Sequence, residues 1–206
     1  VLFATPEQHL SWDGTYRYRP DPDLFYLTGF GEPEAVAVLD ADRREYRLFV
    51  RPRDRERETW EGRRAGVKGA VKAHGADEAF EVGELEKKLS DLVRGAGTLH
   101  YAFGVDEKRD LLVASILGRF RREARVPKRG PVVVNDVTDV IHEMRLRKEP
   151  EEVALMERAA AITVAAHEEA RALARPGRWE YEVEAAIAAR FRGDGASGPS
   201  YETIVA

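Results

Sequence analysis

The sequence predicts an α/β fold, in which a domain built on a mixed sheet is followed by the beginning of a second domain. Two short runs, 35–39 and 46–50, are rich in β-branched and aromatic residues and flank a polar turn, which indicates a hairpin. Strand-like and helix-like runs then alternate as far as residue 134, which favours helices packed against a mixed sheet. The sequence becomes rich in alanine after about residue 148, so we place a domain boundary at residue 147.

The remaining elements of the first domain follow from hydrophobic spacing. Three short apolar runs predict further strands: 1–4, 98–102 and 131–134. Three charged or amphipathic segments predict helices: 54–64, 83–93 and 106–122. In the third helix, Asp106 is the expected N-cap. Its buried stripe is expected to comprise Val113, Ile116, Leu117 and Phe120.

The second domain is expected to open with two helices and a strand. Pro150 and the acids after it suit a helix start, and the alanine-rich helix runs to about residue 174. Its apolar face is expected to comprise Leu155, Ala159, Ile162, Ala166 and Leu173. A second helix is expected over 180–192 and a strand from 203 onwards. Both ends of the sequence interrupt strand-like runs, so we expect a longer parent chain.

The composition excludes several classes of function. The absence of cysteine excludes disulfides, zinc–thiolate sites, iron–sulfur clusters and a cysteine nucleophile. The chain has 33 basic and 37 acidic residues and a net charge of −4, which argues against general binding of nucleic acid or anionic membranes. No apolar run reaches the ~18 residues of a membrane span. These features predict a cytoplasmic protein.

No complete active site is encoded in these residues by themselves. None of the five histidines has metal-ligand spacing, so we interpret each as a surface or core histidine. No serine lies in a nucleophile-elbow motif, and no glycine-rich phosphate loop is present. The basic residues between 119 and 129 are interpreted as a solvated helix end. Trp60 stands among alternating charges, which indicates a subunit interface or a pocket wall and leaves both possible.

Several ordered motifs carry a resemblance to a known family. They are R-x-x-x-D-L-F-Y-L-T-G-F-x-E-P-E-A at 19–35, R-D followed by W-E-G-R-R-A-G at 53–66, H-E-M-R-L-x-K-x-x-E-E at 142–152, R-P-G-x-x-E at 175–180 and P-S-Y-E-T-I-V at 199–205. The chain resembles the aminopeptidase P branch of the creatinase/prolidase family over nearly its whole length. The resemblance implies a creatinase-type N-terminal domain of ribonuclease-H-like motif over 1–147. It also implies that 148–206 are the first elements of an incomplete α+β pita-bread domain.

The family's chemistry is implied by the same resemblance. By this resemblance the parent protein is expected to be a metal-dependent exopeptidase with two manganese ions (Mn2+). Such an enzyme releases the N-terminal residue of peptides whose second residue is proline. The family's metal ligands, two Asp, one His and two Glu, all lie downstream of the segment that matches 199–205. None is therefore assigned here, and the chain alone is expected to be inactive. The implied partners are peptide substrates and further copies of the chain, in a dimer or a tetramer.

Four residues receive roles through the resemblance. Tyr201 matches a tyrosine that lies beside the metal centre. Trp60 matches a tryptophan that reaches into a neighbouring subunit's active site in tetrameric members. Arg125 falls where the family places an arginine at the border of the substrate cleft, and Asp13 matches an acidic residue at the same subunit junction as Trp60.

Two alternatives remain open at this level. Pita-bread proteins without metal ligands exist as binding modules, so the chain could belong to a non-catalytic binding or oligomerisation protein. A prolidase-like dipeptidase is the second alternative, and it differs from an aminopeptidase in accepting an Xaa-Pro dipeptide.

Overall fold

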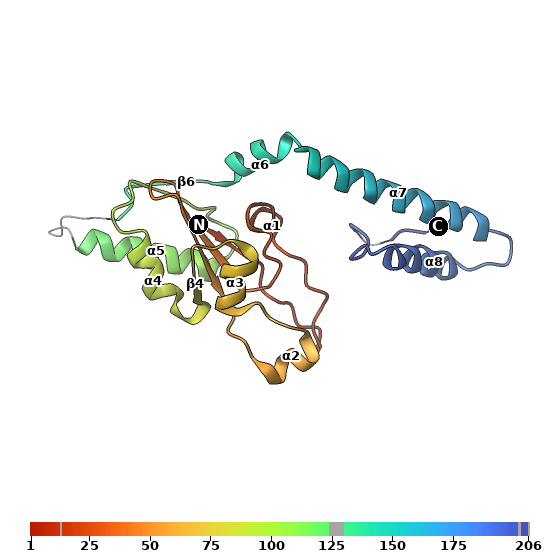
Figure 1. Ribbon diagram of the computed structural model, residues 1–206, viewed down its shortest axis with the longest axis horizontal. Coiled ribbons are helices and arrows are strands. Elements are labelled where there is room, and N and C mark those ends of the chain that lie inside the picture. Colours follow the sequence, from red (N-terminus) through yellow and green to blue (C-terminus); the bar gives the residue numbers. More distant parts are fainter. Residues whose placement is uncertain (13, 124–129, 202, 206) are drawn as a thin grey trace. The chain divides into compact units, whose positions relative to one another are not determined.

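The computed structural model describes residues 1–206 except 13, 124–129, 202 and 206, and it divides into two compact units (Figure 1). The first unit comprises Val1–His142 and the second Glu143–Ala206. In the described part of the chain, no helix is both long and apolar enough to cross a membrane.

A four-stranded mixed sheet forms the centre of the first unit. Its strands are β1 (Leu2–Phe3), β2 (Val36–Asp40), β3 (Glu45–Val50) and β4 (Glu78–Glu81), in the order β1-β2-β3-β4. Strand β2 is antiparallel to both of its neighbours, β1 and β3, whereas β3 and β4 are parallel. The predicted hairpin is therefore β2–β3, and the predicted mixed sheet is confirmed.

A second, parallel pair of strands comprises β5 (Thr98–His100) and β6 (Val133–Asn135). The nitrogen of Val1 donates a hydrogen bond to the carbonyl oxygen of His100 at 2.8 Å. This bond places the beginning of the chain, just before β1, beside β5. The predicted strands at 98–102 and 131–134 correspond to this pair.

Among the described residues of the first unit, six α-helices accompany the strands. They are α1 (Pro22–Thr28), α2 (Arg55–Glu61), α3 (Gly66–His74), α4 (Leu85–Leu92, preceded by the 3₁₀ turn η1, Val82–Glu84), α5 (Glu107–Arg122) and α6 (Thr138–Leu146), the last of which contains the boundary between the units. Aspartate side chains cap three helix starts, because a carboxylate there accepts bonds from otherwise unpaired backbone N–H groups. Asp21, Asp54 and Asp106 accept such bonds at α1, α2 and α5.

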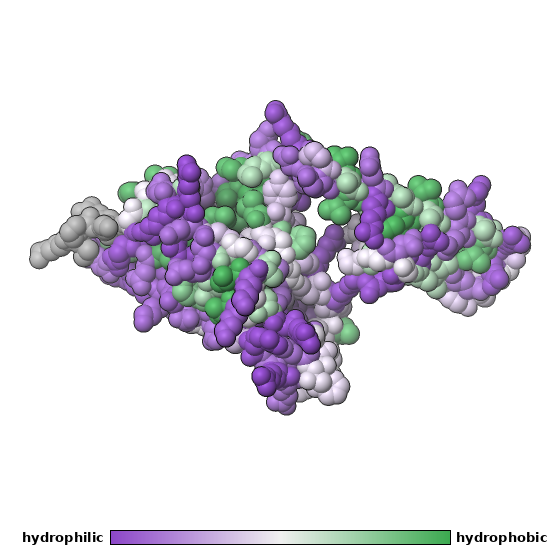
Figure 2. Space-filling view, in the orientation of Figure 1, coloured by the Kyte–Doolittle hydropathy of each residue, from purple (hydrophilic) through white to green (hydrophobic). Residues whose placement is uncertain are grey.

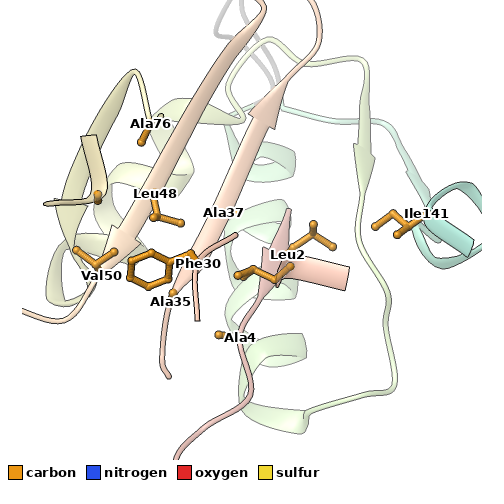
Figure 3. Close-up of a cluster of buried hydrophobic side chains, with 11 residues drawn as sticks. Leu2, Ala4, Phe30, Ala35, Ala37, Leu48, Val50, Ala76 and Ile141 are labelled. Carbon is orange, nitrogen blue, oxygen red and sulfur yellow. The ribbon is translucent and has the colours of Figure 1, made fainter. Parts of the chain in front are cut away.

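One face of the sheet packs against α1, α3 and α6. Alternate strand residues point to this face, since successive side chains of a strand point to opposite sides. Figure 3 shows Leu48 and Val50 of β3 beside Phe30, with Leu2 of β1 and Ile141 of α6 in the same cluster.

The other face of the sheet packs against α4 and α5. Phe49 of β3 is fully buried here and lies 5.3 Å from the ring of Phe80 on β4. Burying a phenylalanine side chain stabilises a fold by about 2 kcal/mol. The helix residues on this face include Leu89, Val113, Ile116 and Phe120. The stripe predicted for α5 is thus confirmed, and the unit consists of a sheet between two helical layers.

The second unit pairs two helices, α7 (Pro150–Leu173) and α8 (Glu180–Gly193). Their contact is small and apolar, with Ala166, Val183 and Ile187 at its centre. Arg190 of α8 adds an ion pair to Glu169 of α7 at 2.9 Å. Both helices lie close to the predicted ranges.

Some expectations are wrong. Thr203–Val205 form no strand, because a strand needs a hydrogen-bonded neighbour and these residues have none among the described residues. Leu155, expected on a buried face of α7, is 67% exposed because α8 covers only part of that face. Four elements carried no prediction: α1, α3, β4 and α6.

Candidate functional site

An excursion between β3 and α3, residues 51–66, carries the first predicted site residue. We call this segment the α2 arm (Figure 1). Its helix begins where Asp54 Oδ1 accepts bonds from the backbone nitrogens of Glu56 and Arg57 at 3.1 and 3.2 Å. It ends at Gly62, whose nitrogen donates to the carbonyl oxygen of Glu58. Trp60 lies in the last turn and is 87% exposed.

Ion pairs hold the arm in shape. Arg53 binds Glu58 with two bonds, Nε to Oε1 at 2.8 Å and NH2 to Oε2 at 2.5 Å. The hydrogen bonds from Arg53 stabilise the charged carboxylate and lower the pKa of Glu58 to about 2. Because each partner holds the other in a fixed plane, the pair restrains the start of α2.

The base of the arm is closed by two further side chains. Arg64 donates to Glu61 Oε2 at 2.7 Å and to the carbonyl oxygen of Pro52 at 3.4 Å. Glu32, which lies outside the arm, accepts a bond from the backbone nitrogen of Ala65 at 2.6 Å. The two ends of the arm are therefore tied to each other and to the loop that follows α1.

The Trp60 side chain is free to contact another molecule. Among the described residues, no aromatic or cationic side chain stacks on it. A large aromatic side chain exposed on an ordered helix is typical of an interaction site. Asp13 and Arg125, the other two residues predicted near a cleft or subunit junction, lie outside the residues that the structure describes.

The second unit contains a cavity of about 560 Å³ between α7, α8 and the segments 195–201 and 203–204. Its walls are largely apolar and include Leu155, Ile162, Ile187, Phe191 and Ile204. Figure 2 shows hydrophobic side chains interspersed with hydrophilic ones along α7. Tyr201 lines this cavity and is 75% exposed, so its hydroxyl is accessible. Trp60 belongs to the first unit and Tyr201 to the second.

His167 also lines this cavity, although the sequence indicated only a surface or core histidine. Its Nδ1–H donates to the carbonyl oxygen of Thr163 at 2.9 Å, one helical turn earlier. Thr163 and Ala159 line the same wall at four-residue spacing. This spacing is visible in the sequence and could have identified His167 as a cavity residue.

The described residues do not fit a metal centre. No three His, Asp or Glu side chains among them lie close enough together to hold a metal ion. Tyr201 and His167 offer one oxygen and one nitrogen to the cavity, which is too few for a stable site. No step of a reaction can therefore be assigned to a metal held by these residues alone.

Comparison with known families places these features in a known context. Residues 1–102 match the family model described as aminopeptidase P, N-terminal domain. Residues 154–206 match the model of metallopeptidase family M24. The first match lies within the first unit and the second match within the second unit.

A bacterial relative decides the assignment. The Xaa-Pro aminopeptidase of Escherichia coli (strain K12) is 41% identical over 208 aligned residues, which include the whole of this chain and 47% of that protein. The chain belongs to the aminopeptidase P family. The α2 arm and Trp60 therefore lie within an aminopeptidase P N-terminal domain, and Tyr201 lies in the segment that matches family M24.

Solved structures of aminopeptidase P agree with the fold. The structure of Pseudomonas aeruginosa aminopeptidase PepP is 40% identical and matches with a TM-score of 0.94, over all of this chain and 47% of that one. Zinc-substituted E. coli aminopeptidase P in complex with product is 41% identical and matches with a TM-score of 0.92, over 98% of this chain and 47% of that one. The predicted fold class is confirmed. The chain spans about half the length of the aminopeptidase P relatives that it matches.

Proposed function

We propose that this chain is the N-terminal half of a metal-dependent Xaa-Pro aminopeptidase, which releases the N-terminal residue from peptides with proline in second position. The observation that carries the proposal is the identity of 41% to the E. coli enzyme over the whole chain. The proposed domains are a creatinase-type N-terminal domain over 1–147 and the start of a pita-bread metallopeptidase domain over 148–206.

The remaining half of the enzyme would supply the metal ligands, and two Mn2+ ions are the proposed cofactor. When bound, such ions would supply an activated water and polarise the scissile carbonyl. The described residues of this chain do not complete such a site, so residues 1–206 alone are proposed to be inactive. The E. coli enzyme has also been studied in a zinc-substituted form.

The residues of this chain would shape the substrate site. The bond before proline lacks an N–H group, so a proline-specific site must recognise ring shape and the free amine. Trp60 and Asp13 are proposed to lie at a subunit junction in a homo-oligomer, where the apolar Trp60 ring would form part of a neighbour's pocket. Arg125 is proposed to border the cleft, and the Tyr201 hydroxyl to lie beside the metal centre. The enzyme is proposed to act in the cytoplasm.

The test is peptide hydrolysis by the full-length protein, before and after removal of metal with a chelator. We expect metal-dependent release of the first residue from an Xaa-Pro-Xaa tripeptide and much slower release from the matched Xaa-Ala-Xaa tripeptide. Hydrolysis of an Xaa-Pro dipeptide in preference to the tripeptide would instead indicate a prolidase-like dipeptidase. Absence of metal-dependent hydrolysis would overturn the proposal in favour of a non-catalytic binding module.

A further inference from the structure

Within α2, Glu58 is the residue best covered from solvent. The Glu58 side chain is only 7% exposed, whereas the other six residues of the helix face solvent: Arg55, Glu56, Arg57, Thr59, Trp60 and Glu61. A carboxylate is seldom so well covered unless a partner compensates its charge. Its partner is Arg53, through the two bonds described above.

This pair differs from an ordinary surface ion pair within a helix. Arg53 precedes the N-cap residue Asp54, so the pair joins the chain that enters the helix to the middle of the helix. A guanidinium and a carboxylate that form two parallel bonds fix their mutual orientation as well as their distance. The pair therefore resists rotation of α2 about its own axis.

The helix geometry links this restraint to Trp60. Successive residues of an α-helix are turned by about 100°, so residues two apart point about 200° away from each other. With Glu58 held towards Arg53, Trp60 is directed to the opposite side of α2. Its exposed fraction of 87% agrees with this direction.

The Arg53 side chain is itself confined by the far end of the arm. Gly66 has a φ of +57°, and a Cβ placed there would lie 2.6 Å from Cγ of Arg53. The arginine stem thus occupies the space that a larger residue would need at position 66. The beginning and the end of the arm therefore meet at this contact.

We infer that Glu58 is a positioning residue, which holds α2 in one rotation through Arg53 and so directs the exposed Trp60 outward. The inference rests on the proposed contact role of Trp60, because the orientation has a function only if that side chain meets a partner. Glu58 itself is not proposed to touch substrate.

Hydrogen–deuterium exchange of the full chain tests the inference with three variants. Glu58→Gln removes the negative charge and one of the two hydrogen bonds to Arg53. We expect exchange of the α2 amides to accelerate about tenfold while the amides of β2 and β3 stay protected. Glu56→Gln is the matched control, because it makes the same change on the same helix at an exposed side chain without an ion pair among the described residues. The exchanged pair Arg53→Glu with Glu58→Arg should restore protection.

Equal exchange in Glu58→Gln and Glu56→Gln would overturn the inference. So would accelerated exchange throughout the first unit, because that would show a general loss of stability. Peptide hydrolysis by the full-length protein reports separately on the proposed function. Trp60→Ala and Glu58→Gln should impair the same kinetic parameter, and a Trp60→Ala enzyme with normal kinetics would refute the contact role of Trp60 while exchange still decides the role of Glu58.

Discussion

Tyr101 donates its phenolic hydrogen to Oδ1 of Asp110 at 2.7 Å, which joins the residue after β5 to the first turns of α5. The other carboxylate oxygen of Asp110 accepts a bond from the backbone nitrogen of Gly104 at 2.9 Å. Tyr101 is only 4% exposed, and its ring packs edge-on against Phe3 and Phe103. One buried hydroxyl therefore helps to fix the loop between β5 and α5.

The variant Tyr101→Phe should destabilise the fold by about 2 kcal/mol, the usual net contribution of a hydrogen bond to a charged group. The phenylalanine ring keeps the aromatic packing, so the loss isolates the hydroxyl. Urea unfolding followed by circular dichroism measures the change. Tyr181→Phe is the control, because Tyr181 is 64% exposed and its hydroxyl makes no hydrogen bond to the described residues. An unchanged unfolding midpoint for Tyr101→Phe would contradict the prediction.

The same residue predicts a loss of stability at alkaline pH. Burial, followed by the hydrogen bond to the Asp110 carboxylate, raises the pKa of Tyr101 above its ordinary value of 10.0. Above pH 10 the unfolded chain loses the Tyr101 proton while the folded chain keeps it. The contribution of protonated Tyr101 to the free energy of unfolding is therefore complete below pH 10 and declines as the pH rises further. Burial also raises the pKa of Tyr18 and of Tyr46, which adds to the effect.

The expected measurement is the free energy of unfolding between pH 8 and pH 11. The wild-type chain should lose stability above pH 10, and Tyr101→Phe should lose it less steeply. Parallel curves for the two proteins would show that the Tyr101 proton does not carry the effect.

Gly66→Ala should destabilise the chain more than Gly75→Ala. Both glycines have a positive φ, +57° and +68°, which costs about 1–2 kcal/mol for a residue with a Cβ. Nothing lies within 4 Å of a Cβ added to Gly75, whereas one added to Gly66 would meet the Arg53 side chain at 2.6 Å. The difference between the two unfolding free energies therefore measures the contact between Gly66 and Arg53, and equal values would show that Arg53 simply moves away.

The arm should also lose its order in strong acid. The pKa of Glu58 is lowered to about 2, so its stabilising pair with Arg53 is complete above the ordinary value of 4.5 and is lost as the pH falls through about 2. Amide resonances of residues 55–61 should therefore keep their positions from pH 5 to about pH 3 and shift below that. Glu58→Gln should abolish this transition, and a transition that persists in the variant would assign it to another group.

The sequence predicts those helices and strands whose own residues show a clear hydrophobic pattern, turn or cap. The hairpin β2–β3 has two apolar runs and a polar turn, and α5 has a cap and a complete stripe, so local pattern alone was sufficient for both. Strand β4 has only four residues, and it is held by parallel pairing that sets Phe80 opposite Phe49. The partner lies some thirty residues away in the sequence, so no local pattern reveals it.

The candidate site shows the same limit. Trp60 is conspicuous in the sequence because it stands among charges, but its direction depends on the Arg53–Glu58 pair, which only the structure reveals. The four-residue spacing of Ala159, Thr163 and His167 places them on one face of a helix, but the packing of α7 on α8 decides that this face borders a cavity. The roles of Tyr201, Trp60, Arg125 and Asp13 come from resemblance and stay predictions.

Manganese should leave the melting temperature of residues 1–206 unchanged. A ligand raises the melting temperature only when it binds the native state more tightly than the unfolded one, and the described residues hold no group of three potential metal ligands. Thermal unfolding with and without micromolar Mn2+ measures this, with a chelator-treated sample as the reference. Mn2+ should raise the melting temperature of the full-length protein, because the proposed ligands lie in its other half. A rise of several degrees in the melting temperature of residues 1–206 would locate metal ligands within these residues. It would contradict the proposal that the other half of the protein supplies them.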